Sequence, residues 1–161
     1  MRTRSLLSLA AGDLEAARRE AVDTVSADPL GINSPRALMI SARAALWLHD
    51  VEGARSALTA MTGFPGQGMA AERLTVEAGL AALEGLAEEA AEAYEEAIEA
   101  WRTLECTLDL ALCELDLVLL LGPGPPNDNA TKEAREVFTR LGAKPFLERL
   151  NRAALSEQQP G

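Results

Sequence analysis

The sequence predicts an all-α fold built from repeated pairs of helices. Of its 161 residues, 48% are hydrophobic but only 4% are aromatic. Ala and Leu dominate, which favours closely packed helices over a sheet rich in Val, Ile and Tyr. A turn residue followed five positions later by alanine also recurs, at Gly12 and Ala17, His49 and Ala54, and Gly85 and Ala90. Ala134 continues the series. The first spacings, 37 and 36 residues, are typical of two-helix repeats that stack into a solenoid.

Proline and glycine mark the ends of the predicted helices. The first pair ends before Pro29, because proline disfavours helix in the preceding residue, and Ser34-Pro35 provides an N-cap and a proline at the first helical position. We expect helices at residues 3–10, 13–27, 34–48, 51–61, 69–84, 87–103, 106–121, 129–141 and 145–154. They make one domain of residues 1–155, followed by a polar tail at 156–161 that we expect to be disordered.

Small residues also recur in the first helix of each pair, at Ser5 and Ser8, Ala42 and Ala45, and Ala78 and Ala81. Together with Tyr94 and Ala97 in the third pair and with Pro29 closing the first, this pattern resembles the tetratricopeptide repeat. The resemblance implies a right-handed α-solenoid of about four helix pairs plus a terminal helix, which binds other proteins. Small residues stand where the first helix of this family carries a bulky aromatic. The sequence therefore favours a scaffold arm over a peptide clamp.

A second resemblance covers residues 109–155. The run from Glu133 to Arg149, which contains Leu-Gly-Ala-Lys-Pro-Phe, is similar to the carboxyl-terminal end of the repeat regions in bacterial ATPase-containing LuxR-type transcriptional regulators and cyclase-linked ATPases. It implies a non-enzymatic protein–protein interaction scaffold, the C-terminal arm of a bacterial signalling or transcriptional regulator. The alternative is a helical domain that senses a small effector bound between repeats.

Negative charge is concentrated in the middle of the chain. The net charge is −10, and residues 65–128 carry fourteen acidic and only two basic side chains. Such a surface repels nucleic acid and anionic membranes, so we expect a protein partner with a basic surface. Glu88, Glu92 and Glu95 form part of this acidic helix and are candidate partner contacts. A solvated face is the alternative interpretation, and a di-iron site is disfavoured because it needs Glu-x-x-His motifs.

A second candidate binding surface lies in the second helix pair. The tetratricopeptide register places five residues along the concave side: Arg36, Met39, Arg43, Leu46 and Trp47. Arginine and tryptophan are common at the centre of protein interfaces. Core packing is the alternative interpretation of Trp47.

No constellation of residues predicts catalysis or a cofactor. His49 is the only histidine, and it stands at a turn where the other repeats have glycine, so we interpret it as structural rather than as a general base. The glycine-rich stretch 63–68 lacks the Lys and Ser/Thr of a phosphate-binding loop. We therefore expect no enzyme activity, no cofactor and no metal site.

The two cysteines and the first helix complete the predictions. Cys106 and Cys113 are seven residues apart on one expected helix, about 10 Å along its axis, which is too far for a disulfide. Two free thiols, and apolar runs that are too short to span a membrane, indicate the cytoplasm. The first predicted helix is short, about eight residues, so we expect it to leave the adjoining helix partly uncovered. We expect this end to form a homodimer or to dock against upstream repeats.

Overall fold

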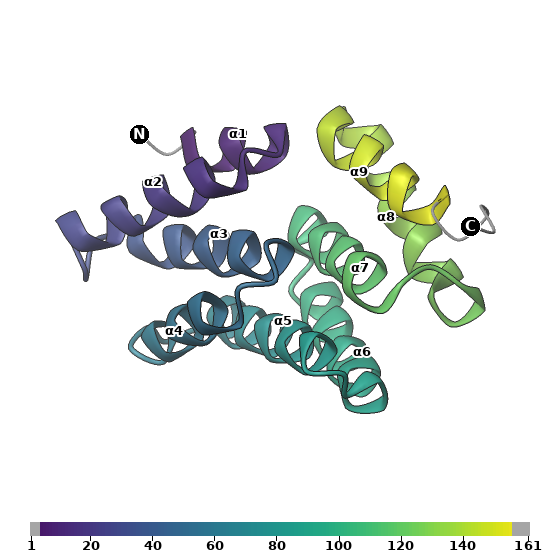
Figure 1. The fold of residues 1–161 in the computed structure, drawn as a ribbon, viewed down its shortest axis with the longest axis horizontal. Helices are drawn as coiled ribbons and strands as arrows, with labels where there is room; N and C mark the ends of the chain where they lie inside the picture. The colour runs from purple at the N-terminus through teal and green to yellow at the C-terminus, as the bar shows by residue number, and fades with distance from the viewer. Residues whose placement is uncertain (1–3, 156–161) are drawn as a thin grey trace.

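The computed structural model describes residues 4–155, and within that range the chain is helical with no strand. The helices are α1 (Arg4–Ala11), α2 (Leu14–Ala27), α3 (Ser34–Trp47), α4 (Val51–Met61), α5 (Gln67–Leu83), α6 (Ala87–Thr103), α7 (Thr107–Leu121), a short 3-10 helix η1 (Pro125–Asn127), α8 (Asp128–Leu141) and α9 (Lys144–Leu155). The all-α prediction is confirmed (Figure 1). The predicted disordered tail, residues 156–161, lies outside the described residues.

The predicted helix limits agree with the structure to within about two residues. Helix α6 has the predicted bounds, whereas α5 begins two residues early at Gln67, after Gly66 with a φ of 114°. Helix α7 begins at Thr107, which leaves Cys106 as its N-cap residue rather than as part of the helix. Cys106 and Cys113 are both free, as predicted.

The turns within the first three pairs share one backbone geometry. Gly12, His49 and Gly85 have φ values of 85°, 58° and 82°, the left-handed conformation that commonly ends a helix. In each turn the next N–H donates to a carbonyl five residues earlier: Asp13 to Ser8 at 2.9 Å, Asp50 to Ala45 at 2.8 Å and Leu86 to Ala81 at 2.9 Å. The predicted equivalence of His49 with the two glycines is therefore confirmed.

Small residues of the sequence repeat lie in the interior. Ala17, Ala54, Ala90 and Ala134, the alanines of the sequence repeat, are all fully buried. A larger side chain at any of these positions would have to displace closely packed neighbours.

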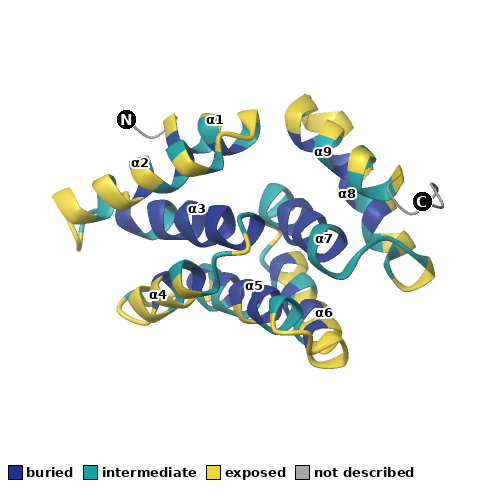
Figure 2. Cartoon of the chain, viewed as in Figure 1, coloured by how far each residue is buried: buried dark blue, intermediate teal, exposed yellow. Residues whose placement is uncertain are grey.

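Helices α3, α5 and α7 form the centre of the molecule (Figure 1). Helix α3 contacts α1, α5 and α7, and α9 contacts α7 and α1. Figure 2 shows that α3, α5 and α7 are buried over most of their length, whereas α2, α4 and α6 each expose one side. No helix in the described part of the chain is long and apolar enough to cross a membrane.

Candidate protein-binding site

The predicted concave surface on α3 is not a surface in this fold. Met39, Arg43, Leu46 and Trp47 are each at most 9% exposed. Only Arg36 reaches the solvent, and its Nη1 donates to Oδ1 of Asp109 on α7 at 2.9 Å. The expectation of an open binding face here is corrected, because neighbouring helices cover this side of α3. The core-packing interpretation of Trp47 agrees with the structure.

Helix α9 covers Trp47. The ring of Phe146 meets the indole edge-on with centroids 6.4 Å apart, and Phe138 of α8 stacks on Phe146 at 5.7 Å. The Arg149 guanidinium lies 4.6 Å from the centroid of the Trp47 ring, a cation–π contact. These aromatic contacts attach the last helix to the second pair.

Trp47 also belongs to a buried polar junction, which consists of Arg43, Trp47, Glu72 and Asp116. Arg43 Nε donates to Oδ2 of Asp116 at 2.9 Å and to Oδ1 at 3.2 Å, and the Trp47 indole N–H donates to Oδ1 at 2.7 Å. Arg43 Nη2 is 3.7 Å from Oε1 of Glu72, too long for a hydrogen bond. The junction therefore brings α3, α5 and α7 together. The Asp116 carboxylate accepts three hydrogen bonds, whereas the Glu72 carboxylate accepts none.

Burial controls the charge of this junction. Burial raises the pKa of Glu72 to about 7, although the positive charge of Arg43 opposes the rise. Burial likewise raises the pKa of Asp116, opposed by Arg43 and by the Trp47 hydrogen bond. Burial alone would lower the pKa of Arg43, but Asp116 and Glu72 outweigh it and raise that pKa. We conclude that Arg43 stays charged and that Glu72 changes its protonation near neutral pH.

Further polar side chains extend from the junction into α6 and α7. The Trp101 indole N–H donates to Thr75 Oγ1 at 3.0 Å, and that hydroxyl donates to the Ala71 carbonyl at 2.9 Å. Burial, reinforced by the charge of Asp116, raises the pKa of the Cys113 thiol, so its nucleophilic thiolate form is disfavoured. The hydroxyl of Tyr94 is buried without a hydrogen-bond partner. This arrangement holds helices together and offers no activated nucleophile.

A separate buried carboxylate lies where α7 meets α8. Burial raises the pKa of Glu114 to about 9, and the negative charge of Glu133 adds to the rise. Glu133 also accepts a hydrogen bond of 2.9 Å from Arg102 of α6. Glu114 is therefore protonated at neutral pH.

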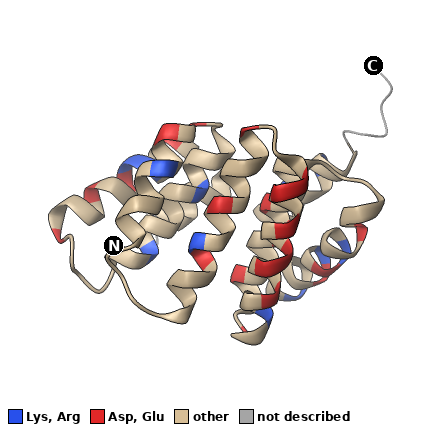
Figure 3. Ribbon diagram, turned by 90° about the horizontal axis from the view of Figure 1, so that it is seen from below, with Lys and Arg blue, Asp and Glu red and all other residues tan. Residues whose placement is uncertain are grey.

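The outer side of α6 carries an acidic face, which we define as Glu88, Glu89, Glu92, Glu95, Glu96 and Glu99. All six are exposed, and Figure 3 shows the red stripe that acidic residues form along one helix. Among the described ion pairs, only Glu99 of this face has a partner, Arg102 at 3.3 Å. The structure thus places the predicted contacts Glu88, Glu92 and Glu95 together on the surface, apart from the buried residues of α3.

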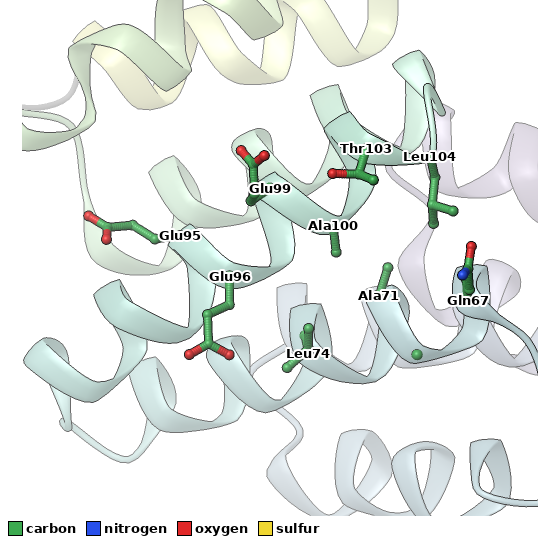
Figure 4. A pocket seen from close by; sticks show the side chains of 10 residues that line it. Gln67, Ala71, Leu74, Glu95, Glu96, Glu99, Ala100, Thr103 and Leu104 are labelled. Carbon is green, nitrogen blue, oxygen red and sulfur yellow. The ribbon is translucent and has the colours of Figure 1, made fainter.

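An apolar groove runs between the first half of α5 and the second half of α6, beside the acidic face. Its volume is about 690 Å³, and it is lined by Gln67, Ala70, Ala71, Leu74, Glu95, Glu96, Glu99, Ala100, Thr103 and Leu104. Figure 4 shows Ala71 and Leu74 of α5 opposite Ala100 of α6, with Glu96 extending towards α5. The groove is open to solvent along its length. It is not the enclosed cavity expected of an effector site between repeats, and that alternative stays a prediction.

Sequence reasoning missed Glu72, Glu114 and Asp116 as interior residues. The signal was present, because Glu114 and Asp116 stand in a helix that is apolar on all sides, and such a carboxylate needs an interior partner. In the described part of the chain, no group of three or more His, Cys, Asp or Glu side chains is placed to hold a metal.

Comparison of the chain with protein-family models, with curated proteins and with solved structures found no match.

Proposed function

We propose that this domain is a non-enzymatic scaffold that binds a partner protein with a basic surface through the acidic face of α6. The observation that carries the proposal is the row of exposed carboxylates along three turns of one helix, of which only Glu99 has an ion-pair partner among the described residues. Like charges at spacings of three and four residues destabilise a helix. A cationic partner relieves this repulsion and is attracted over a long range.

The architecture supports a scaffold of the tetratricopeptide-like kind, a right-handed α-solenoid. Three turns share one left-handed geometry, and a fully buried alanine follows each of them by five residues. The segment that resembles the end of bacterial regulator arms forms α8 and α9. We therefore propose a cytoplasmic C-terminal arm of a signalling or transcriptional regulator. An ATPase or DNA-binding reading frame next to the gene would support this context, and its absence in the source genome and its relatives would contradict it.

The first helix pair offers a second protein contact. Leu7 of α1 is 62% exposed, and Leu30 and Ile32 in the loop after α2 are 85% and 84% exposed. A large apolar side chain this exposed gains free energy when a partner covers it. We propose that this end meets a second copy or upstream repeats. Light scattering after size-exclusion chromatography tests self-association, and replacing Leu7, Leu30 and Ile32 by Ser should abolish any dimer.

Charge reversal tests the main proposal. We expect the variant with Glu88, Glu92 and Glu95 replaced by Lys to lose the partner proteins that the unaltered domain recovers from cells of its source organism. The matched control replaces Glu15, Glu52 and Glu148, three exposed carboxylates on other helices, by Lys and changes the net charge equally. Quantitative mass spectrometry compares the two. Equal recovery by both variants would remove the acidic face as the binding surface.

A further inference from the structure

We propose that the α5–α6 groove is the docking site of a basic amphipathic helix in the partner, whose apolar side fills the groove and whose Lys or Arg residues meet the acidic face. This inference rests on the proposed function and specifies the partner. An α-helix is one of the recurring ways in which a protein presents apolar anchors to a groove.

The floor of the groove has the chemistry of a helix-docking surface. Ala70, Leu74, Ala100 and Leu104 are half-buried, and the Ala71 side chain between them is fully buried. Alanines at this surface leave room for a partner's Leu or Phe side chains, and they let a helix backbone approach closely. Gln67 at the start of α5 and Thr103 at the end of α6 are polar and limit the apolar stretch to about two turns. The groove therefore matches a short run of anchors rather than a long helix.

The rim gives the partner its charge and its spacing. Glu89, Glu92, Glu96 and Glu99 follow one another at three or four residues on α6, the side of the helix from which Glu96 extends over the groove (Figure 4). At about 1.5 Å of rise per residue, neighbouring carboxylates are about 4.5 to 6 Å apart along the axis. A second helix lying along the groove presents cations at the same interval when Lys or Arg recurs every three or four residues. We infer a partner with Leu-type anchors at i, i+3, i+4 and i+7 and basic residues on the adjoining face.

The nearby cations of the chain itself neutralise only the Glu99 end of this rim. Arg102 pairs with Glu99 and with Glu133, and Arg73 of α5 donates at 3.4 Å to the carbonyls of Met61 and Phe64, away from the acidic face. Among the described ion pairs, none includes Glu89, Glu92 or Glu96. These three exposed carboxylates are therefore available to the Lys or Arg residues of a partner helix.

Two synthetic peptides of one composition separate the groove from simple charge attraction. One places Leu and Lys as an amphipathic helix, and the other scrambles the same residues so that no apolar face forms. Fluorescence anisotropy with the full chain measures both affinities. We expect the amphipathic peptide to bind at least about tenfold more tightly, and its affinity to fall with added salt because its charged contacts are exposed.

Two protein variants locate the site. Ala100→Phe fills the groove and should weaken the amphipathic peptide about tenfold, whereas Ala91→Phe, at an exposed position of the same helix outside the groove, should leave it unchanged. Replacing Glu92, Glu96 and Glu99 by Lys should abolish binding. Circular dichroism and thermal unfolding establish that each variant folds. The scrambled peptide keeps the test valid if Ala100→Phe does not fold, because that comparison uses the unaltered chain.

The outcomes distinguish this inference from the proposed function. Equal binding of both peptides would overturn the groove as a helix site but leave the acidic face as a basic-partner surface. Binding of neither peptide, together with cellular partners that survive charge reversal of the face, would overturn both. A homodimer that dissociates when Glu92, Glu96 and Glu99 become Lys would show that a second copy of this chain occupies the groove instead.

Discussion

The indole N–H of Trp47 donates a 2.7 Å hydrogen bond to Oδ1 of Asp116, the same carboxylate that binds Arg43. Trp47 and Arg43 are four residues apart on α3, so both point from one face of that helix. One carboxylate on α7 therefore holds two side chains of α3. Arg43, Trp47 and Asp116 are all buried. Removing the negative charge of Asp116 should therefore weaken the contact between α3 and α7.

The Arg43–Asp116 pair should dominate the stability of the interior. Asp116→Asn removes the hydrogen-bonded counter-charge of the buried Arg43 and leaves only Glu72, at 3.7 Å. We expect a loss of about 3 to 5 kcal/mol in the free energy of unfolding. The matched control is Asp109→Asn, which removes the partner of the half-exposed Arg36 on the same two helices and should cost less than about 1 kcal/mol. Urea unfolding followed by circular dichroism measures both. Equal losses would show that burial does not set the strength of these pairs.

Stability should fall as the pH rises through neutrality. The folded-state pKa of Glu72, about 7, lies above its ordinary value of 4.5, so the folded protein holds this proton more tightly than the unfolded chain. The resulting stabilisation is complete below about pH 4.5 and is lost as the pH passes through about 7. We expect about 1 to 3 kcal/mol less stability from this group at about pH 8 than at about pH 5. Glu114, with a pKa of about 9, acts in the same direction over a wider range.

Glu72→Gln tests which carboxyl is responsible. The amide is uncharged at every pH, so this variant should lose the part of the pH dependence that Glu72 contributes and should be more stable than the unaltered protein at pH 8. Glu114→Gln serves as the parallel variant for the α7–α8 contact. Urea unfolding across the pH range measures each variant. An unchanged pH profile in both would place the effect elsewhere.

Two glycines of α5 should respond to alanine with opposite signs. A Cβ added to Gly79 would lie 2.7 Å from Cδ1 of Leu46, a buried side chain of α3 with little room to move. We expect Gly79→Ala to cost about 1 to 3 kcal/mol through overpacking. A Cβ added to Gly68 meets nothing within 4 Å, so Gly68→Ala should stabilise the helix by about 0.5 to 1 kcal/mol. Thermal unfolding of the two variants gives the sign directly.

His49 should be replaceable by glycine with a gain in stability. Its φ of 58° is unfavourable for a residue with a Cβ, and its side chain is exposed, so little packing is lost. We expect His49→Gly to stabilise the protein by about 0.5 to 1 kcal/mol. Gly85→Ala, which adds a Cβ in an equivalent turn with a φ of 82°, should destabilise it by a similar amount. A stability loss in His49→Gly would indicate that the imidazole makes a contact that stabilises the turn.

The sequence predicted the local structure well because local signals determine it. Turn residues such as Gly12 and Gly85 require a left-handed backbone, and alanines such as Ala54 and Ala90 fit helix crossings. These features recur at regular intervals and can be recognised without knowing which helices meet. The helix limits followed from them to within about two residues.

The partners of the interior charges could not be assigned from the sequence because they depend on contacts between distant helices. Arg43 and Asp116 are 73 residues apart, and only the folded arrangement brings α3 against α7. Assigning Arg43 and Trp47 to a concave surface assumed that no later helix covers α3, whereas α9 covers Trp47. The α5–α6 groove was missed for a related reason. It depends on which side chains of two helices line the same hollow, which hydrophobic periodicity does not report.

The two arginine–aspartate pairs between α3 and α7 have a mechanical consequence. Arg36 pairs with Asp109 and Arg43 with Asp116, and each pair spans 73 residues, so the two helices run in the same direction with matched positions two turns apart. A slip of one residue would rotate a helix by about 100° and break both pairs at once. Because these helices belong to the second and fourth pairs, the contact bridges across the third. Pulling on the ends should therefore not stretch the array gradually like a spring. The α3–α7 contact should resist the pulling force until the Arg36–Asp109 and Arg43–Asp116 pairs break together.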